Sequence, residues 1–315
     1  MSGKIIVVCF FVATLLCSSS AWATAPHGNT TPIVSVVDSA ALFNTLNRDQ
    51  TDSTETTNEY LPEWYDMITN IPGDIYGYGK ETFQLKNIPA ILGMAAATGI
   101  LIVTDQQTWE AADRWYRTSP AVRQGSDIAE FIGDGKFQFG ISAAFAGYGF
   151  IFHDNRAIRT ASQTVEAILA CGAVVQVLKH VTGRESPFVE TQKGGAWRFF
   201  PNQIDYAEHV PHYDAFPSGH IATAMTTLTV IAENYPEATW IRPVFYPVLG
   251  LVATSLITTG IHWWSDIPLG VALGYSFGVI CSHPELTTIN KNSVNMSFLP
   301  VLYPDGAGIS LNMTF

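Results

Sequence analysis

Three short segments of the chain hold residue types that can do chemistry together. They are Lys179–Arg184, Pro217–His220 and His262–Asp266, and each lies where an apolar, helix-like stretch meets a polar loop. Their candidates for chemistry are His220, His262, the Asp266 carboxylate and the cations Lys179 and Arg184. Metal-free phosphoryl transfer needs a nucleophile, a proton donor for the leaving oxygen and donors around the phosphate oxygens. The three segments therefore predict a phosphoryl-transfer site, provided that the fold brings them together.

Each of the three acid–base residues has a definable role in such a site. His262 can attack phosphorus as a neutral imidazole and form a phosphohistidine. Asp266, one helical turn later, can accept a hydrogen bond from the other ring nitrogen and fix the tautomer. His220 can donate a proton to the leaving oxygen. The catalytic residues are therefore predicted to be His262, His220 and Asp266.

The remaining residues of these segments suit phosphate binding. Ser218 and the Gly219 amide come at the start of an expected helix, where backbone N–H groups attract anions. Lys179 and Arg184 add positive charge. Each signal is weak alone, because a lone histidine is commonly structural and a His-x3-Asp spacing fits an ordinary helical pair. The prediction depends on their joint order.

An all-α helical bundle of about six core helices is expected to position these residues. In an up-down bundle, Lys179 would end one helix, His220 begin the next, His262 end another and Asp266 begin the last, so all four would share one side. The insertion 181–217 has no periodicity, and a loop of this length in a compact domain is commonly functional. The helix-like stretches cover about 88–104, 107–118, 136–152, 160–180, 218–234, 240–262 and 266–281.

The chain divides into four parts. Residues 1–23 have the pattern of a secretory signal peptide, with Lys4, an apolar run and a small-x-small site at Ala21–Ala23. Residues 24–87 are predicted to be a polar lead-in that ends in an irregular peripheral segment. Residues 88–283 would form the phosphatase-type bundle, and 284–315 a C-terminal appendage with a short β-hairpin.

Composition limits the partners. The chain of 315 residues is 47% hydrophobic and 14% charged, with a net charge of −11. It has no basic tract, so nucleic acid is not an expected partner. Cys171 and Cys281 lie in apolar runs and are predicted to be buried thiols. Because no CxxC or Cys/His cluster is present, neither a metal nor a cofactor is expected.

In its three motifs the chain resembles the type 2 phosphatidic acid phosphatase superfamily, which includes bacterial class A acid phosphatases and vanadium haloperoxidases. The family signature is Lys-x6-Arg-Pro, Pro-Ser-Gly-His and Ser-Arg-x5-His-x3-Asp. It aligns here with Lys179–Pro187, Pro217–His220 and Ser255–Asp266, and the resemblance covers about residues 88–282. The resemblance implies that His262 is the nucleophile, supported by Asp266, and that Lys179, Ser218, Gly219 and His220 bind phosphate or act as acid.

Two positions depart from the signature. Ser186 and Leu256 stand where the family has arginines that hold phosphate oxygens. Each such charge-assisted contact is worth about 1.5–3 kcal/mol. Our hypothesis is that Arg184 and Arg198 take their place; alternatively, Arg198 is a surface residue that stacks on a neighbouring aromatic ring. Asp214 is a weaker candidate for the wall of the site.

The sequence thus favours an exported, metal-independent phosphomonoesterase. Its substrate would be a phosphate ester, with lipid phosphates and isoprenyl diphosphates among the candidates. Two alternatives stay open, a vanadate-dependent haloperoxidase and a degenerate phosphate- or lipid-binding protein. Because the apolar runs are short, a periplasmic globular bundle that contacts a membrane surface is favoured over a protein that crosses the membrane several times.

Overall fold

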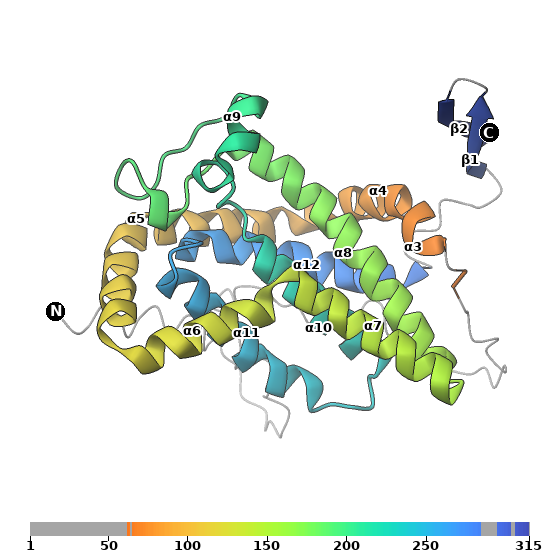
Figure 1. Cartoon of the computed structure of the whole chain (residues 1–315), viewed down its shortest axis with the longest axis horizontal. Coiled ribbons are helices and arrows are strands. Elements are labelled where there is room, and N and C mark those ends of the chain that lie inside the picture. Colours follow the sequence, from red (N-terminus) through yellow and green to blue (C-terminus); the bar gives the residue numbers. More distant parts are fainter. Residues whose placement is uncertain (1–61, 64, 285–294, 304–305, 315) are drawn as a thin grey trace, which may run out of the picture.

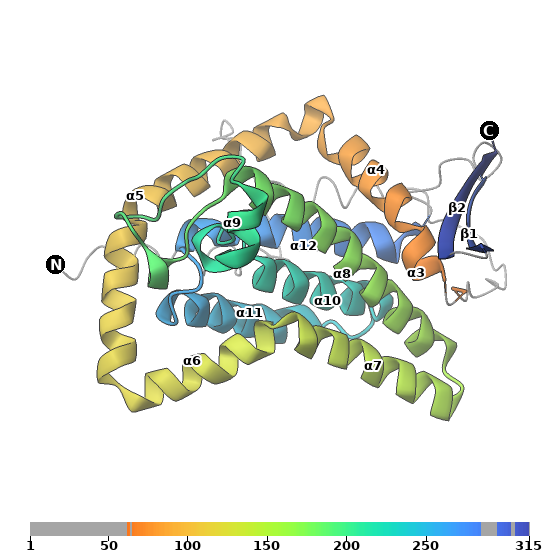
Figure 2. The same ribbon diagram turned by 45° about the horizontal axis from the view of Figure 1, so that its top comes forward.

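The computed structural model describes residues 62–63, 65–284, 295–303 and 306–314. The predicted signal peptide and most of the lead-in lie outside these residues. The described part is mainly helical, as predicted, but it contains ten α-helices rather than about six (Figures 1 and 2). They are α3 (Asp66–Thr69), α4 (Ile71–Thr82), α5 (Ile88–Thr118), α6 (Pro120–Gly133), α7 (Gly135–Phe152), α8 (Asn155–Thr182), α9 (Gln203–Glu208), α10 (Gly219–Asn234), α11 (Ile241–Thr258) and α12 (Ile267–Ser282).

The expected break in the first long helix is absent. The stretches predicted at 88–104 and 107–118 form a single helix, α5, and Asp105 lies inside it. The sequence analysis did not predict α6, which begins where the Ser119 side chain accepts a hydrogen bond from the Val122 amide at 3.4 Å. A serine cap followed by Pro120 is a regular helix start, and the apolar residues after it recur on one face, so the local signals for this helix were present in the sequence.

The segment 61–87 was predicted to be irregular, but its described residues are largely helical. Its glycines lower its helix propensity, so packing decides its structure. Ile71, Ile75 and Tyr78 of α4 contact a core cluster of α8, α10 and α12. Asp74, on the same helix, is also buried.

Helices α8, α10 and α12 form the centre of the bundle. A Cβ atom on Gly274 of α12 would lie 2.3 Å from the Ala222 carbonyl oxygen of α10, and one on Gly278 would lie 2.5 Å from Thr229 Cβ. These glycines therefore let the two helices approach closely. The close packing fixes the start of α10 relative to the start of α12, where the motif residues lie.

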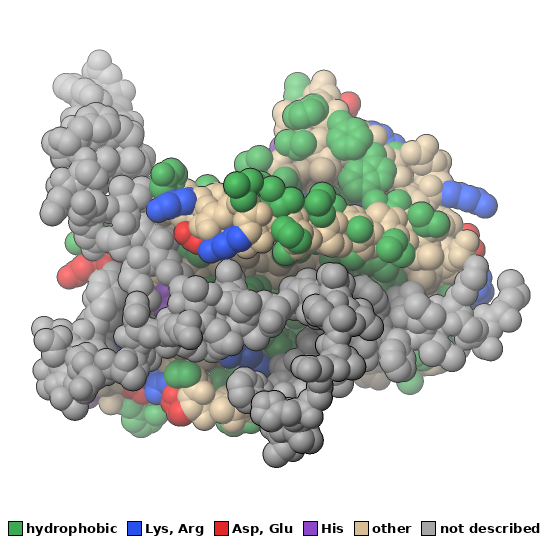
Figure 3. All heavy atoms as spheres, turned by 180° about the vertical axis from the view of Figure 1, so that it is seen from behind, with side chains coloured by type: hydrophobic (Ala, Val, Ile, Leu, Met, Phe, Trp, Pro, Cys, Tyr) green, Lys and Arg blue, Asp and Glu red, His purple; other side chains and the backbone are tan. Residues whose placement is uncertain are grey.

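Among the described residues, four helical segments are long and apolar enough to cross a membrane. They are Leu85–Thr118, Asn155–Thr182, Ile241–Thr258 and Trp264–Ser282. The most apolar window, in Leu85–Thr118, has a mean hydropathy of 1.8 and none of it is buried in the protein. Hydrophobic side chains are frequent on the face seen in Figure 3. The continuous α5 is longer than the apolar run predicted at 88–104, and the four segments fit membrane association. The preference for a bundle on the membrane surface over one that crosses the membrane stays a prediction.

Two strands follow the bundle. β1 (Asn295–Tyr303) and β2 (Gly306–Thr314) pair antiparallel, with Asn295 opposite Thr314. Their side chains lie outside the described residues, so the role of this segment as a structural appendage stays a prediction.

Candidate active site

The motif residues gather at one end of the bundle. Lys179 lies in the last turn of α8, and His220 in the first turn of α10. His262 follows α11, and Asp266 belongs to a short 3-10 helix (Trp264–Asp266) that leads into α12. In Figures 1 and 2 these four helix ends lie toward the same end of the bundle, and the C-terminal part of α5 turns across it.

His262 is buried and its ring is oriented by the backbone. Its Nδ1 lies 2.7 Å from the carbonyl oxygen of Ala215 and 3.5 Å from Oδ2 of Asp266. Because a carbonyl oxygen only accepts, Nδ1 must carry the hydrogen, and Nε2 then has the lone pair. The main tautomer-fixing partner is therefore Ala215, which the sequence did not reveal, and Asp266 is the more distant of the two acceptors.

His220 lies beside His262. The ring centroids are 5.6 Å apart, with an interplanar angle of 73°. Burial, together with the nearby Lys179 cation, lowers the pKa of His262 to about 3. Burial, His262 and Lys179 lower the pKa of His220 to about 4. In the absence of an anion, both imidazoles are therefore neutral at pH 7.

The start of α10 faces the Lys179 ammonium group. Ser218 is fully buried and caps the helix by accepting from the Ile221 amide at 3.4 Å. A Cβ atom on Gly219 would lie 3.7 Å from Lys179 Nζ. Lys179 Nζ also lies 3.3 Å from Oδ2 of Asp214. This end of the site combines a cation with a helix N-terminus, a favourable setting for phosphate.

Arg184 is fully buried and engaged by carboxylates. Its Nη2 donates to Asp105 Oδ2 at 2.7 Å, and its Nη1 donates to Asp266 Oδ1 and to Ser265 Oγ. Asp105 also accepts from the Ser265 amide at 3.1 Å. The guanidinium lies 4.6 Å from the Trp197 ring centroid. Arg184 thus connects α5 to the segment that carries Asp266.

Gly183 makes this placement possible. It ends α8 with φ at +52°, and a Cβ atom there would lie 2.1 Å from the Arg198 carbonyl oxygen. Only glycine fits a left-handed residue with this close contact. The chain then turns so that the Arg184 carbonyl oxygen accepts from the Ala215 amide at 2.9 Å. Through Ala215, the long loop therefore sets the orientation of His262.

Arg198 belongs to a second network, centred on Glu185. Arg198 Nη2 lies 3.3 Å from Glu185 Oε1, and the guanidinium lies 5.5 Å from the Tyr213 ring centroid. Burial alone would raise the pKa of Glu185, but hydrogen bonds from Thr191, His212 and the Ala196 amide outweigh it and lower the pKa. These contacts hold the loop together.

The two positions without the family arginines are both buried. Ser186 is 1% exposed, and its amide donates to the Pro211 carbonyl oxygen at 2.9 Å. Leu256 is 0% exposed and lies in an apolar cluster with Ile221 and Val252.

Asp105 and Ser265 are residues of this region that sequence reasoning missed. The signal for Asp105 was present: it is an acidic residue directly after a long apolar run, within a continuous helix. Ser265 lies inside a recognised motif but was given no role.

The comparisons with known proteins agree with the motifs. Residues 161–287 match the family model described as the PAP2 superfamily. A search of the curated proteins gave no match. Among solved structures, Aquifex aeolicus LpxE is 20% identical with a TM-score of 0.42, covering 56% of this chain and 93% of its own. A transmembrane PAP2-type phosphatidylglycerolphosphate phosphatase from Bacillus subtilis is 14% identical with a TM-score of 0.41, covering 72% and 98%.

The family match is shorter than the predicted 88–282, but it contains every residue of the three motifs. The family whose model matches residues 161–287 is the one that the motifs predicted.

Proposed function

We propose that the protein is a metal-independent, membrane-associated lipid-phosphate phosphatase that acts through a phosphohistidine on His262. The observation that carries this proposal is the pair of imidazoles. The Ala215 carbonyl oxygen fixes Nδ1–H of His262 and leaves Nε2 as the nucleophile, while His220 lies beside it at the N-terminus of α10.

In the first step, Nε2 of His262 forms a bond to phosphorus and the bond from phosphorus to the leaving oxygen breaks. His220, protonated when the phosphate anion is bound, gives its proton to that oxygen. In the second step, water attacks the phosphohistidine, His220 takes a proton from this water, and inorganic phosphate leaves. Lys179 and the amides at the start of α10 stabilise charge on the phosphate oxygens.

We assign Arg184 a positioning role rather than the phosphate contact expected from the sequence. Asp105 and Asp266 already accept hydrogen bonds from both of its terminal nitrogens. Arg198 is likewise held by Glu185. Lys179, the helix N-terminus and the protons on the histidines would then balance most of the phosphate charge.

A cavity beside the site supports a lipid substrate. It has a volume of about 710 Å³, and its walls come largely from apolar side chains of α7, α10 and α11. Ile132 and Val252 are among the lining residues. Gly133 follows Ile132 and lies close to both the cavity and the site, since a Cβ atom there would lie 2.5 Å from Val252 Cγ1 and 3.7 Å from His220 Cβ. The volume is typical of sites for organic ligands and suits an acyl or isoprenyl chain.

The activity test measures release of inorganic phosphate from p-nitrophenyl phosphate, phosphatidic acid and an isoprenyl diphosphate, with EDTA present. We expect turnover by the wild type and none by His262→Asn. His153→Asn, at an exposed position after α7, is the control and should keep full activity. Equal turnover by His262→Asn and the wild type would disprove the phosphohistidine mechanism.

The substrate test uses two neighbouring alanines of α7. Both are exposed, but Ala144 lines the cavity and Ala143 is not among the lining residues. Ala144→Trp should raise the KM for phosphatidic acid at least tenfold and leave that for p-nitrophenyl phosphate unchanged. Ala143→Trp should change neither. Equal effects of the two substitutions would reject the cavity as the lipid site.

A further inference from the structure

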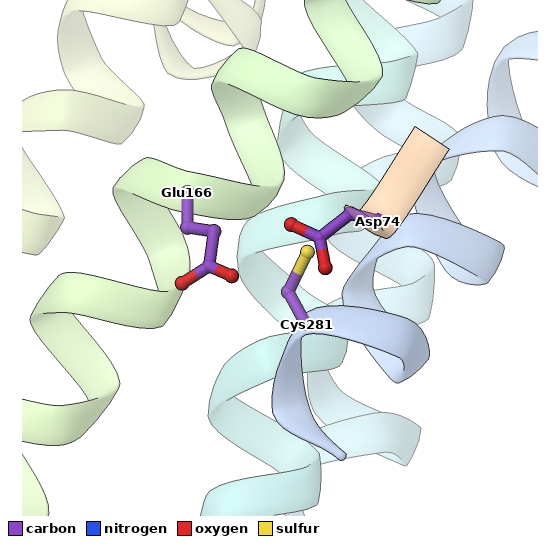
Figure 4. A group of neighbouring side chains, drawn as sticks. All are labelled: Asp74, Glu166 and Cys281. Carbon is purple, nitrogen blue, oxygen red and sulfur yellow. The ribbon is translucent and has the colours of Figure 1, made fainter. Parts of the chain in front are cut away.

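Three acidic side chains meet inside the bundle, away from the phosphatase site. Asp74 comes from α4, Glu166 from α8 and Cys281 from α12, and they are 1%, 4% and 2% exposed. One ligand atom of each lies within 4.8 Å of the others. Figure 4 shows the Asp74 carboxylate next to the Cys281 sulfur, with the Glu166 carboxylate directed toward both.

The cluster is remote from the catalytic residues. Along α8, Glu166 precedes Lys179 by 13 positions, and along α12, Cys281 follows Asp266 by 15. At a rise of 1.5 Å per residue, both separations are about 20 Å. The cluster therefore plays no direct part in phosphoryl transfer.

The cluster lacks a counter-charge among the described residues. The buried carboxylates Asp105 and Asp266 pair with Arg184, and Glu185 pairs with Arg198. No such ion pair is found for Asp74 or Glu166 in the described part of the chain. Asp74 Oδ2 is buried and has no hydrogen-bond partner there. Glu166 and Cys281 hydrogen-bond to the Asp74 side chain, and an ion held among the three groups would also satisfy Oδ2.

We propose that Asp74, Glu166 and Cys281 form a binding site for a divalent transition-metal ion of the zinc type. One thiolate and two carboxylates suit a cation of intermediate softness, which excludes Ca²⁺ and Mg²⁺ as the preferred ions. A water molecule would complete four-fold coordination. Binding displaces the protons that otherwise neutralise the three acids.

The geometry needs only a small adjustment. Ligand atoms about 2.1–2.3 Å from one tetrahedral ion lie about 3.6 Å from one another. Side-chain rotations that move these atoms by roughly 1 Å would therefore bring them from within 4.8 Å to that separation.

The ion would connect α4 to α8 and α12. Because α4 precedes α5, this connection would stabilise the path of the chain toward Asp105. The metal would therefore be structural and would leave the chemistry on His262 metal-free.

The test uses full-length protein in detergent, with Cys9 and Cys17 replaced by serine so that Cys171 and Cys281 are the remaining thiols. Co²⁺ is added and the near-ultraviolet absorption of a cobalt–thiolate bond is recorded, with the bound metal counted by mass spectrometry. We expect this band and a single bound ion per chain. Cys281→Ser should remove the band, and Asp74→Asn should weaken Co²⁺ binding at least tenfold.

Cys171→Ser is the matched control, because Cys171 is also a free, buried thiol of the bundle and lies outside the cluster. It should keep the band. Absence of the band from folded protein with Cys281 intact would overturn the proposal, as would equal loss in Cys171→Ser and Cys281→Ser. The three groups would then be a protonated, hydrogen-bonded cluster. Phosphate release is a separate readout, so failure of the metal site leaves the proposed phosphatase function untouched.

Discussion

Replacing Asp105 with asparagine tests whether the buried ion-pair network positions the catalytic segment. The Asp105 carboxylate accepts from Arg184 Nη2 at 2.7 Å and from the Ser265 amide at 3.1 Å, and it also accepts from Ser265 Oγ. An asparagine keeps the shape but offers one oxygen and a donor, so at least one of these donors loses its acceptor. Breaking one side of a buried ion pair costs about 3–5 kcal/mol. We therefore expect the free energy of unfolding to fall by about that amount.

The catalytic effect should appear in kcat rather than in KM. In our assignment Arg184 does not touch the phosphate, but it holds Asp266 and Ser265 next to His262. A shift of about 1 Å in a reacting group costs roughly 100-fold in rate, so we expect kcat to fall between tenfold and 100-fold while KM changes less than threefold. Thermal unfolding followed by tryptophan fluorescence, together with steady-state phosphate release, measures both quantities.

Asp113→Asn is the matched control on the same helix. Asp113 pairs with Arg117, whose side chain is 74% exposed, and a pair of this kind contributes less than about 1 kcal/mol. Its thermal midpoint and kcat should stay close to those of the wild type. A wild-type kcat and midpoint in Asp105→Asn would refute the positioning role. A rise in KM alone would instead show that Arg184 contacts the phosphate.

Four further predictions follow from the same structure. Burial lowers the pKa of His262 to about 3 and that of His220 to about 4, from 6.5. As the pH falls, both histidines therefore take up protons in the unfolded chain before they do so in the folded protein. Their contribution to stability should be complete above about pH 6.5 and decrease as pH falls toward 3, seen as a falling midpoint in pH-dependent melts. Asp214→Asn, which frees Lys179 from its ion pair, should strengthen inhibition by phosphate about fivefold, whereas an unchanged inhibition constant would reject that competition. Gly183→Ala should lower the free energy of unfolding by at least 2 kcal/mol, measured in denaturant titrations. Alkaline carbonate should fail to release the protein from membranes, and its release into the soluble fraction would show surface attachment only.

Sequence pattern was sufficient to predict that the motif residues meet at one end of the bundle. Lys179, His220 and His262 each mark a helix end, and alternating helix direction places those ends together without any knowledge of packing. The starts of α10 and α12 could be placed well because Ser218 and Pro268 are strong local signals. Helix ends with local signals of this kind can be read directly from sequence.

The roles of Arg184 and Asp105 could not be predicted in this way. Their contact joins positions 79 residues apart, and it depends on α5 continuing through Asp105 rather than breaking there. A charged residue after an apolar run resembles a helix end at the level of sequence, and only tertiary packing shows that it faces a buried cation. The Ala215 carbonyl was equally hidden, because any residue type supplies the same backbone oxygen.

The loss of the two family arginines has a consequence for the pH dependence of the reaction. Lys179 and Arg184 are the cations that influence His262, yet Asp214, Asp105 and Asp266 engage them with three carboxylates. A phosphate dianion that enters this site therefore lacks a free cation to pair with, and His220 can supply positive charge by taking up a proton, while His262 must keep the Nε2 lone pair with which it attacks. Substrate binding should thus be accompanied by proton uptake, which favours kcat/KM at acidic pH. In a relative with both arginines, substrate binding would need less proton uptake. With Ser186 and Leu256 in their place, protons taken from the solvent supply the positive charge that the arginines would provide.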